Sequence, residues 1–173
     1  MQKTEIAIGL GSNLGDRSRS LREAVDRLSS EFLEDMVVSS VYESEPWGDT
    51  QQPKFLNMVV KGVSEWKPPA IINYLKSLER ELGRIVRHRY GPREIDLDLL
   101  AFGRGVWKSE GVTVPHPAMW ERSFVVLPLA EVWSDWEHPI LKQRAGDAAL
   151  DWLKNPPVSS IAIGPLPPNT VTL

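Results

Sequence analysis

Two aspartates, Asp96 and Asp98, are the residues whose type and spacing point most clearly to chemistry. They alternate with Ile95, Leu97 and Leu99 in a short apolar run that is typical of a strand. Because side chains alternate between the faces of a strand, both carboxylates lie on one side, roughly 6–7 Å apart. Two negative charges at that separation repel by about 3 kcal/mol at an effective dielectric constant near 20. Magnesium bound together with substrate phosphates would relieve this repulsion, whereas the alternative is a solvated outer face of the strand.

The segment 84–93 (RIVRHRYGPR) leads directly into these aspartates and contains four arginines, one histidine and no acid. Such a charge run is most often a solvated surface. Guanidinium groups also bind phosphate oxygens in a fork and stabilise negative charge that develops during transfer. Arginines next to a candidate magnesium site therefore indicate a polyphosphate substrate.

Weaker candidates are His116, which lies between two prolines, and Phe55 and Asn57, which lie at the start of an apolar run. Each of these residues is more often structural when it occurs alone. The sequence contains no Walker-type phosphate loop, no G-x-S-x-G and no H-E-x-x-H motif. With no cysteine and three histidines, zinc catalysis is disfavoured.

The composition describes an ordinary globular protein. Of 173 residues, 42% are hydrophobic and 25% are charged, which excludes a disordered or fibrous chain. The net charge of −3 disfavours nucleic-acid binding, and the absence of cysteine excludes a disulfide framework. Because no apolar run approaches ~20 residues and no signal-peptide pattern opens the chain, we expect a cytoplasmic protein without a membrane span.

Periodicity predicts the elements in the order β-α-β-β-α-β. They cover residues 6–10, 17–30, 36–42, 56–63, a helix from 68, and 95–102. This order is typical of a ferredoxin-like sheet with helices on one side, in the α+β class. We further expect an edge hairpin over 106–114 and C-terminal helices over 124–132, with Pro128 at the start or at a kink, and over 147–154. Residues 1–154 would form one domain, and residues 155–173 a proline-rich tail.

Several motifs, in this order, resemble the hydroxymethyldihydropterin pyrophosphokinase family of folate biosynthesis. The matching stretches are Gly9–Asp16 (GLGSNLGD), Ser39–Tyr42, Glu45–Gly48, Phe55–Asn57, Glu79–Arg84, Gly91–Asp98 (GPREIDLD) and Val114–Pro117, with Arg122 and Phe124. Together they span roughly residues 5–135. The run G-P-R-x-I-D-L-D, followed by V-P-H about 16 residues later, is the most specific of them.

The resemblance implies that the β,γ-pyrophosphoryl group of ATP is transferred to the hydroxymethyl oxygen of a reduced pterin, with release of AMP. It implies two magnesium ions bound by Asp96 and Asp98, and catalytic contacts from Arg84 and Arg93 to the phosphates. Two metal ions can clamp the attacking and leaving oxygens of an in-line displacement, which agrees with the interpretation of the aspartate pair.

The resemblance also implies the two substrate sites. Residues implied for ATP are Glu79, Arg87, Tyr90, Leu99, Thr113, His116 and Arg122. Residues implied for the pterin are Ser44, Trp47, Gly48, Phe55, Asn57 and Phe124, with the two phenylalanines stacking on the ring and Asn57 pairing with its polar edge. The arginine spacing is one residue longer than in the family, which leaves open whether Arg87 or Arg89 contacts ATP, and Lys76 receives no role.

Two long loops, Glu43–Lys54 and Arg84–Pro92, are expected to close over the substrates and exclude water. The partners would be ATP and the reduced pterin, bound by a monomer without nucleic acid or membrane. A ferredoxin-like RNA-binding module, using Tyr90 and the arginines, is the main alternative, and the aspartate pair argues against it. A kinase that transfers one phosphoryl group is a second alternative, which would release ADP.

Overall fold

The computed structural model describes residues 2–155 and 160–166. Within these residues the strands are β1 (Thr4–Ser12), β2 (Glu34–Val38), β3 (Val41–Ser44), β4 (Phe55–Ser64), β5 (Asp96–Phe102), β6 (Trp107–Ser109), β7 (Val112–Val114) and β8 (Ser160–Gly164). The helices are α1 (Arg17–Glu31), α2 (Pro68–Glu81), a short 3-10 helix (Met119–Glu121), α3 (Ser123–Trp133) and α4 (Ala145–Lys154).

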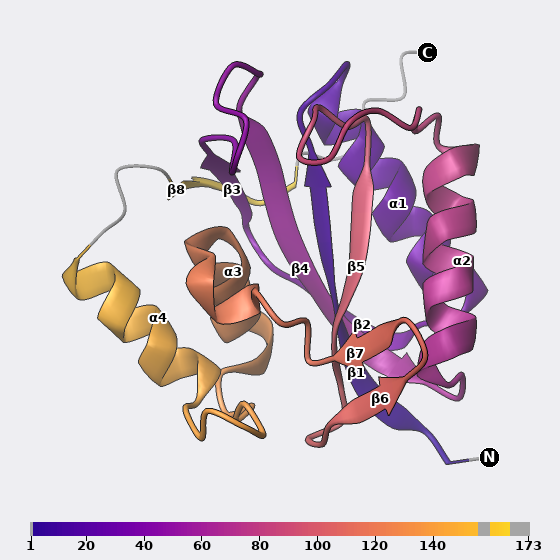
Figure 1. Cartoon of the computed structure of the whole chain (residues 1–173). Coiled ribbons are helices and arrows are strands. Elements are labelled where there is room, and N and C mark those ends of the chain that lie inside the picture. Colours follow the sequence, from indigo (N-terminus) through magenta and orange to yellow (C-terminus); the bar gives the residue numbers. More distant parts are fainter. Residues whose placement is uncertain (1, 156–159, 167–173) are drawn as a thin grey trace.

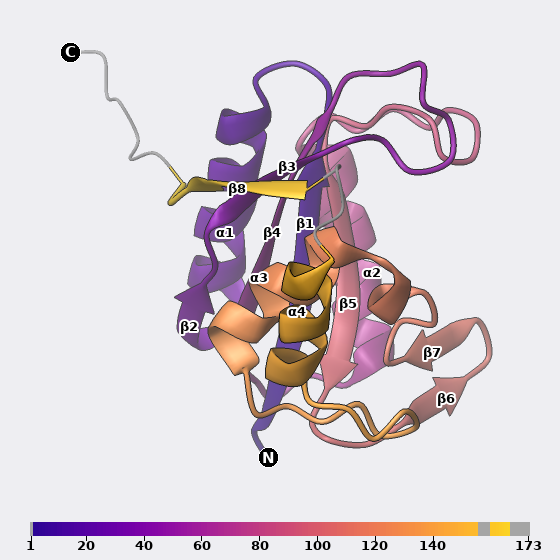
Figure 2. The same cartoon turned by 90° about the vertical axis from the view of Figure 1, so that its left-hand side faces the viewer.

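One sheet lies at the centre of the molecule, in the order β5-β1-β4-β3-β8, with β2 also paired to β4. The pairings within it are antiparallel. Helices α1 and α2 cover one face of the sheet, and α3 and α4 cover the other (Figures 1 and 2). The predicted mixture of helices with an antiparallel sheet is confirmed. No helix of the described residues is long and apolar enough to cross a membrane.

Local signals account for the ends of the first two helices. The side chain of Asp16 accepts a hydrogen bond from the Arg19 N–H at 3.0 Å, which caps the start of α1. Helix α2 begins at Pro68, where a missing N–H costs nothing. It ends just before Gly83, whose φ of +93° favours a residue without a β-carbon.

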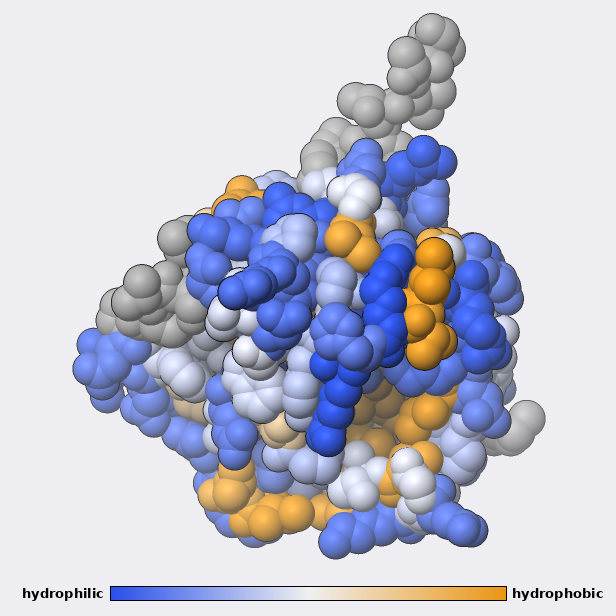
Figure 3. Space-filling model, turned by 45° about the horizontal axis from the view of Figure 1, so that its top comes forward, coloured by the Kyte–Doolittle hydropathy of each residue, from blue (hydrophilic) through white to orange (hydrophobic). Residues whose placement is uncertain are grey.

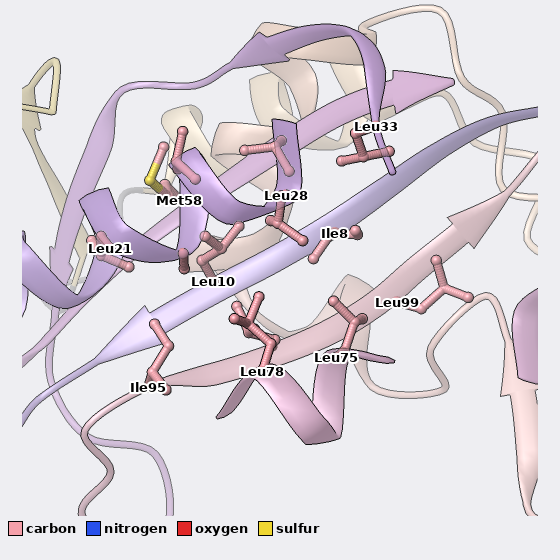
Figure 4. Packing of buried hydrophobic residues seen from close by; sticks show 14 of the residues in the cluster. Ile8, Leu10, Leu21, Leu28, Leu33, Met58, Leu75, Leu78, Ile95 and Leu99 are labelled. Atoms are coloured by element: carbon pink, nitrogen blue, oxygen red, sulfur yellow. The ribbon is translucent and has the colours of Figure 1, made fainter. Parts of the chain in front are cut away.

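The main core lies between the sheet and these two helices (Figure 4). Ile71, Leu75 and Leu78 recur at helical spacing along α2 and are at most 1% exposed. They pack with Ile95 and Leu97, the apolar side of the strand that carries the aspartates. Burying this side fixes the opposite direction for the carboxylates, since alternate residues of a strand face opposite ways.

The second face of the sheet is covered by α3 and α4, with Trp133 and Trp136 almost fully buried beside Val59 and Ala101. Two of the seven tryptophans thus form part of a core. Pro128 lies inside α3, so of the two predicted positions, the helix start or a kink, the helix start is excluded.

The structure differs from the sequence prediction at two places. The strand predicted over 36–42 is two strands, because Ser39 is buried between them and its hydroxyl accepts the Val59 N–H at 2.9 Å. Within the predicted tail, β8 pairs with β3, while residues 156–159 and 167–173 lie outside the described residues. A hairpin over 106–114 is present as β6 and β7, but it forms a two-stranded sheet of its own rather than an edge of the main sheet.

Leu78→Ala should lower the free energy of unfolding by at least about 2 kcal/mol, because it leaves a cavity between α2 and the sheet. The matched control is Leu150→Ala on α4, where the native side chain is 57% exposed and the change should be within about 0.5 kcal/mol. Urea unfolding of both variants measures the difference. Equal losses would contradict the assignment of the core.

Candidate active site

The strand beside the two aspartates carries glycines, which have no side chain, opposite each of them. The register of β5 on β1 sets Gly11 opposite Asp96 and Gly9 opposite Asp98, and Gly11 also pairs with Asn57 on β4. A β-carbon on Gly11 would come within 3.0 Å of the Asn57 Oδ1 atom. The two glycines therefore keep open the space between the carboxylates and the amide, where a ligand can approach the backbone.

A cavity of about 460 Å³ occupies this space. The surface shown in Figure 3 is formed mainly by hydrophilic residues, with a few hydrophobic residues among them. Eleven of the residues implied by the resemblance line the cavity: Ser44, Trp47, Phe55, Asn57, Tyr90, Arg93, Asp96, Asp98, His116, Arg122 and Phe124. Residues from distant parts of the sequence are thus brought together around one cavity.

A second cavity of about 310 Å³ adjoins the first. Its wall is formed by α2, β5 and β7, with Leu99 and Thr113 among the residues that line it. Asp98 and His116 line both cavities. The two cavities therefore meet at a carboxylate and an imidazole.

Asp96 is neutralised by two arginines. The Arg84 and Arg93 Nη1 atoms lie 2.8 and 2.6 Å from its two carboxylate oxygens. Burial acts to raise the pKa of Asp96, but the charges of Arg93 and Arg84 outweigh it and lower this pKa below its ordinary value. Asp96 is therefore ionised and holds both guanidinium groups beside the cavity.

Asp98 is in a different electrostatic position. Burial, together with the neighbouring charge of Asp96, raises the pKa of Asp98 above its ordinary value. The Nζ atom of Lys76 lies 3.9 Å from the Asp98 Oδ1 atom. A cation at this carboxylate would therefore offset an unfavourable negative charge.

The donor set fits magnesium bound jointly with a substrate. Asp96 and Asp98 present carboxylate oxygens on one face, and Mg²⁺ is commonly bound by one or two carboxylates plus phosphate oxygens. Among the described residues, no group of three or more His, Cys, Asp or Glu side chains could hold a metal ion. The remaining ligands would have to come from the substrate or from water.

Glu79 lies beneath the site and lines neither cavity. It is 3% exposed, accepts the Leu97 N–H at 2.8 Å and pairs with the Arg84 Nη1 atom at 2.7 Å. Arg84, which also lines neither cavity, is thus held between Glu79 and Asp96. The contact of Glu79 with ATP stays a prediction, and its observed contacts orient the neighbouring arginine.

The structure separates the two arginines between which the sequence left the choice open. Arg87 binds Glu94 through both terminal nitrogens, at 3.0 and 2.7 Å, and does not line the cavity. Arg89 lines the cavity and lies over the ring of Tyr90, with its guanidinium carbon 4.8 Å from the ring centroid. Arg89 is therefore better placed than Arg87 to reach a ligand.

Aromatic contacts join the two predicted loops over the cavity. Trp47 meets Tyr90 edge to face, with ring centroids 5.5 Å apart. The guanidinium carbon of Arg122 lies 4.8 Å from the Trp47 ring centroid. Gly48 has a φ of +89°, and a β-carbon there would come within 3.1 Å of Tyr90, so this glycine permits the close approach.

The polar edge of the first cavity is set by Asn57, which is 7% exposed. Its Nδ2 atom donates to the Ser44 Oγ atom at 2.7 Å. Phe55 of β4 and Phe124 of α3 line the same cavity from different elements. The cavity thus combines apolar rings with one oriented amide, which suits a flat ligand with a hydrogen-bonding edge.

His116 follows the cis Val114–Pro115 peptide bond, and its N–H donates to the Leu100 carbonyl at 3.1 Å. Burial and the positive charge of Arg122 lower the pKa of His116 below its ordinary value. The imidazole at the junction of the cavities is therefore neutral near pH 7.

Asn13 is a site residue for which the sequence predicted no role. It is 2% exposed, and its Nδ2 atom donates to the Gln52 Oε1 atom at 2.8 Å and to the Pro53 carbonyl at 2.9 Å. Its Oδ1 atom accepts the Arg93 N–H at 2.7 Å. In the sequence, Asn13 lies in the motif GLGSNLGD, directly after a predicted buried strand. This position does not reveal its hydrogen-bond partners, which are far away in the sequence.

Comparison with known proteins agrees with this geometry. Residues 7–134 match the family described as 7,8-dihydro-6-hydroxymethylpterin-pyrophosphokinase (HPPK). The chain belongs to this family. The resemblance inferred from the motifs is confirmed.

Two bacterial relatives are named 2-amino-4-hydroxy-6-hydroxymethyldihydropteridine pyrophosphokinase. The protein from Aquifex aeolicus is 41% identical over 138 residues, which cover 80% of this chain and 86% of the relative. The protein from Bacillus subtilis is 44% identical over 126 residues, which cover 72% and 75%. A solved Plasmodium falciparum HPPK-DHPS chain shares the fold, with a TM-score of 0.69 at 12% identity, and this chain spans 43% of its length.

Arg87→Gln should lower the free energy of unfolding near pH 7, because it removes the arginine that pairs with Glu94. The hydrogen bonds from Arg87 lower the pKa of Glu94 from 4.5 to about 2. A lowered carboxylate pKa stabilises the fold above pH 4.5, and this contribution is lost as the pH falls toward 2. Urea unfolding from pH 7 to pH 3 should therefore show the gap between wild type and variant shrinking.

Arg89→Gln is the matched control, because Arg89 stacks on Tyr90 and not on Glu94. The difference in free energy of unfolding between this variant and the wild type should not follow the titration of Glu94. A gap for Arg87→Gln that stays constant with pH would contradict the pairing with Glu94.

Proposed function

We propose that this chain transfers the β,γ-pyrophosphoryl group of ATP to the hydroxymethyl oxygen of 6-hydroxymethyl-7,8-dihydropterin and releases AMP. The observation that carries this proposal is the meeting of two cavities at Asp98 and His116. A transfer between two substrates requires both to be held with their reacting ends together. Membership of the pyrophosphokinase family identifies which two substrates these are.

The pterin would occupy the larger cavity. Phe55 and Phe124 would stack on the flat ring, and Asn57 would pair with its polar edge. An amide that is buried and oriented by Ser44 discriminates against rings without the complementary donors and acceptors, because they leave it unpaired. Trp47 and Gly48 would contribute the covering loop.

ATP would occupy the smaller cavity, with its phosphates reaching the junction. Leu99 and Thr113 would line the nucleoside end, and His116 and Arg122 the phosphate end. Arg93 would contact the phosphates from the opposite side, beside Asp96. Such positioned cations lower the barrier because they stabilise charge as it develops on transfer.

Two magnesium ions would be held by Asp96 and Asp98, and they would neutralise the phosphates for in-line attack. The raised pKa of Asp98 supports this role, because a nearby metal ion compensates the like charge of Asp96. The chain's own contribution is to fix both carboxylates on one rigid strand and to keep Arg84 and Arg93 beside them.

The remaining expectations stay proposals of the same kind. We propose that the protein acts as a monomer on these small molecules, without nucleic acid or membrane. The pyrophosphokinase domain would comprise residues 1–154 together with β8, which pairs with β3 of the central sheet. The ferredoxin-like description of the core is supported by the order β5-β1-β4-β3 with antiparallel neighbours.

Nucleotide chromatography after mixing protein, ATP, magnesium and the reduced pterin tests the proposed reaction. AMP should form in step with the pterin diphosphate, and Asp98→Asn should reduce the rate at least about 100-fold because metal binding is lost. The control is Asp135→Asn, which removes an aspartate paired with Arg104 away from both cavities and should leave the rate unchanged. Formation of ADP instead of AMP would favour a single-phosphoryl kinase and overturn the proposal.

Phe124→Ala should weaken binding of the reduced pterin roughly tenfold, because it removes one stacking face. Phe32→Ala is the matched control, since Phe32 packs against Trp66 and Tyr74 and lines neither cavity. Isothermal titration of both variants measures the affinity. An affinity that is the same in Phe124→Ala as in the wild type would refute the stacking role.

A further inference from the structure

Lys76 is a cation of the smaller cavity to which the sequence assigned no role. It lies on α2, and its Nζ atom is 3.0 Å from the Glu79 Oε1 atom and 3.4 Å from the Leu97 carbonyl. The same nitrogen is 3.9 Å from the Asp98 Oδ1 atom. The ammonium group thus lies next to the point where the two cavities meet.

The surroundings of Lys76 change from apolar to charged along the cavity. Ile72, Leu75 and Leu99 form an apolar part, whereas Asp98 and His116 lie at the junction with the larger cavity. A nucleotide that enters with its phosphates toward the junction would place its base against the apolar part. Its α-phosphate, which joins the nucleoside to the transferred group, would then lie beside Lys76.

The contacts of Lys76 leave it able to move toward such a phosphate. Its side chain is 44% exposed, and its partner Glu79 already accepts the Leu97 N–H and pairs with Arg84. Glu79 would therefore keep two donors if the ammonium group turned away. Lysine has a flexible stem and a compact charge, which suits it to follow a ligand.

We propose that Lys76 binds the α-phosphate of the nucleotide and stabilises the AMP leaving group, an inference that rests on the proposed function. In the transfer, the hydroxymethyl oxygen forms a bond to the β-phosphorus and gives its proton to water. The bond from the β-phosphorus to the α,β-bridging oxygen breaks, and this oxygen leaves on AMP with the electron pair. A lysine at the α-phosphate is attracted more strongly as this negative charge grows.

The competing role is that of a structural counter-ion, in which Lys76 only balances Asp98 and Glu79. The two roles differ in a measurement that needs neither pterin nor turnover. A phosphate contact makes AMP bind more tightly than adenosine, and loss of Lys76 removes part of that difference. A counter-ion that touches no nucleotide acts on AMP only through its charge at a distance, so its loss changes the difference in affinity between AMP and adenosine much less than the loss of a direct contact.

The test is calorimetric titration of wild type, Lys76→Met and Lys76→Arg with AMP and with adenosine. Lys76→Met should weaken AMP binding roughly tenfold or more, as expected for a lost charged hydrogen bond, while adenosine affinity stays within about twofold. Lys76→Arg should restore much of the AMP affinity. Arg80→Met is the matched control, since it removes a positive charge from an exposed position of the same helix and should leave both affinities unchanged.

If the affinities for AMP and adenosine differ as much in Lys76→Met as in the wild type, the assignment of Lys76 is overturned and the proposed function is not affected. A wild type that binds AMP no better than adenosine would overturn this assignment as well, and failure to form AMP from ATP would independently overturn the proposed function. In turnover, Lys76→Met should lower kcat by more than it raises KM for ATP, and a change in KM alone would count against leaving-group stabilisation.

Discussion

The site depends on two carboxylates that the strand geometry forces to the same face of β5. Their repulsion is resolved unequally, because Asp96 is held by Arg84 and Arg93 while Asp98 has a raised pKa and a more distant lysine. Asp96 therefore positions two guanidinium groups, whereas the negative charge of Asp98 would be stabilised by a further cation. In the proposed function, this asymmetry would let a single strand prepare both the phosphate contacts and a metal position.

The opposite face of the same strand explains why this arrangement is rigid. Ile95 and Leu97 are fully buried against α2, so the direction of the aspartates is fixed by the burial of apolar surface rather than by their own bonds. Glu79 adds a polar connection from α2, since it accepts the Leu97 N–H and holds Arg84. Packing and electrostatics on the two faces thus act on the same few residues.

Local pattern sufficed for features that depend on neighbours in sequence. Alternation predicted that the two aspartates face the same side of their strand, and periodicity predicted the helix that begins at Pro68. The break at Ser39 and the pairing of β8 with β3 were missed, because both depend on partners at least twenty residues away in the sequence. The same limit applies to the site. The order of the motifs predicted most of the site residues that line the cavities. The residues next to Lys76 in the sequence, however, do not reveal that its ammonium group lies beside Asp98.

The buried amide of Asn13 shows how the loops and the charged strand are physically connected. Asn13 binds the backbone of Arg93 on one side and Gln52 on the other, and the Gln52 Nε2 atom donates to the Tyr90 carbonyl at 2.7 Å. One chain of hydrogen bonds therefore connects the loop 43–54, the loop 84–92 and the backbone of Arg93 just before β5. Because buried polar groups are costly to leave unpaired, displacement of one loop disturbs the other and the backbone of Arg93 with it. In the proposed function, covering the cavity and placing Arg93 at the phosphates would therefore be parts of the same structural event.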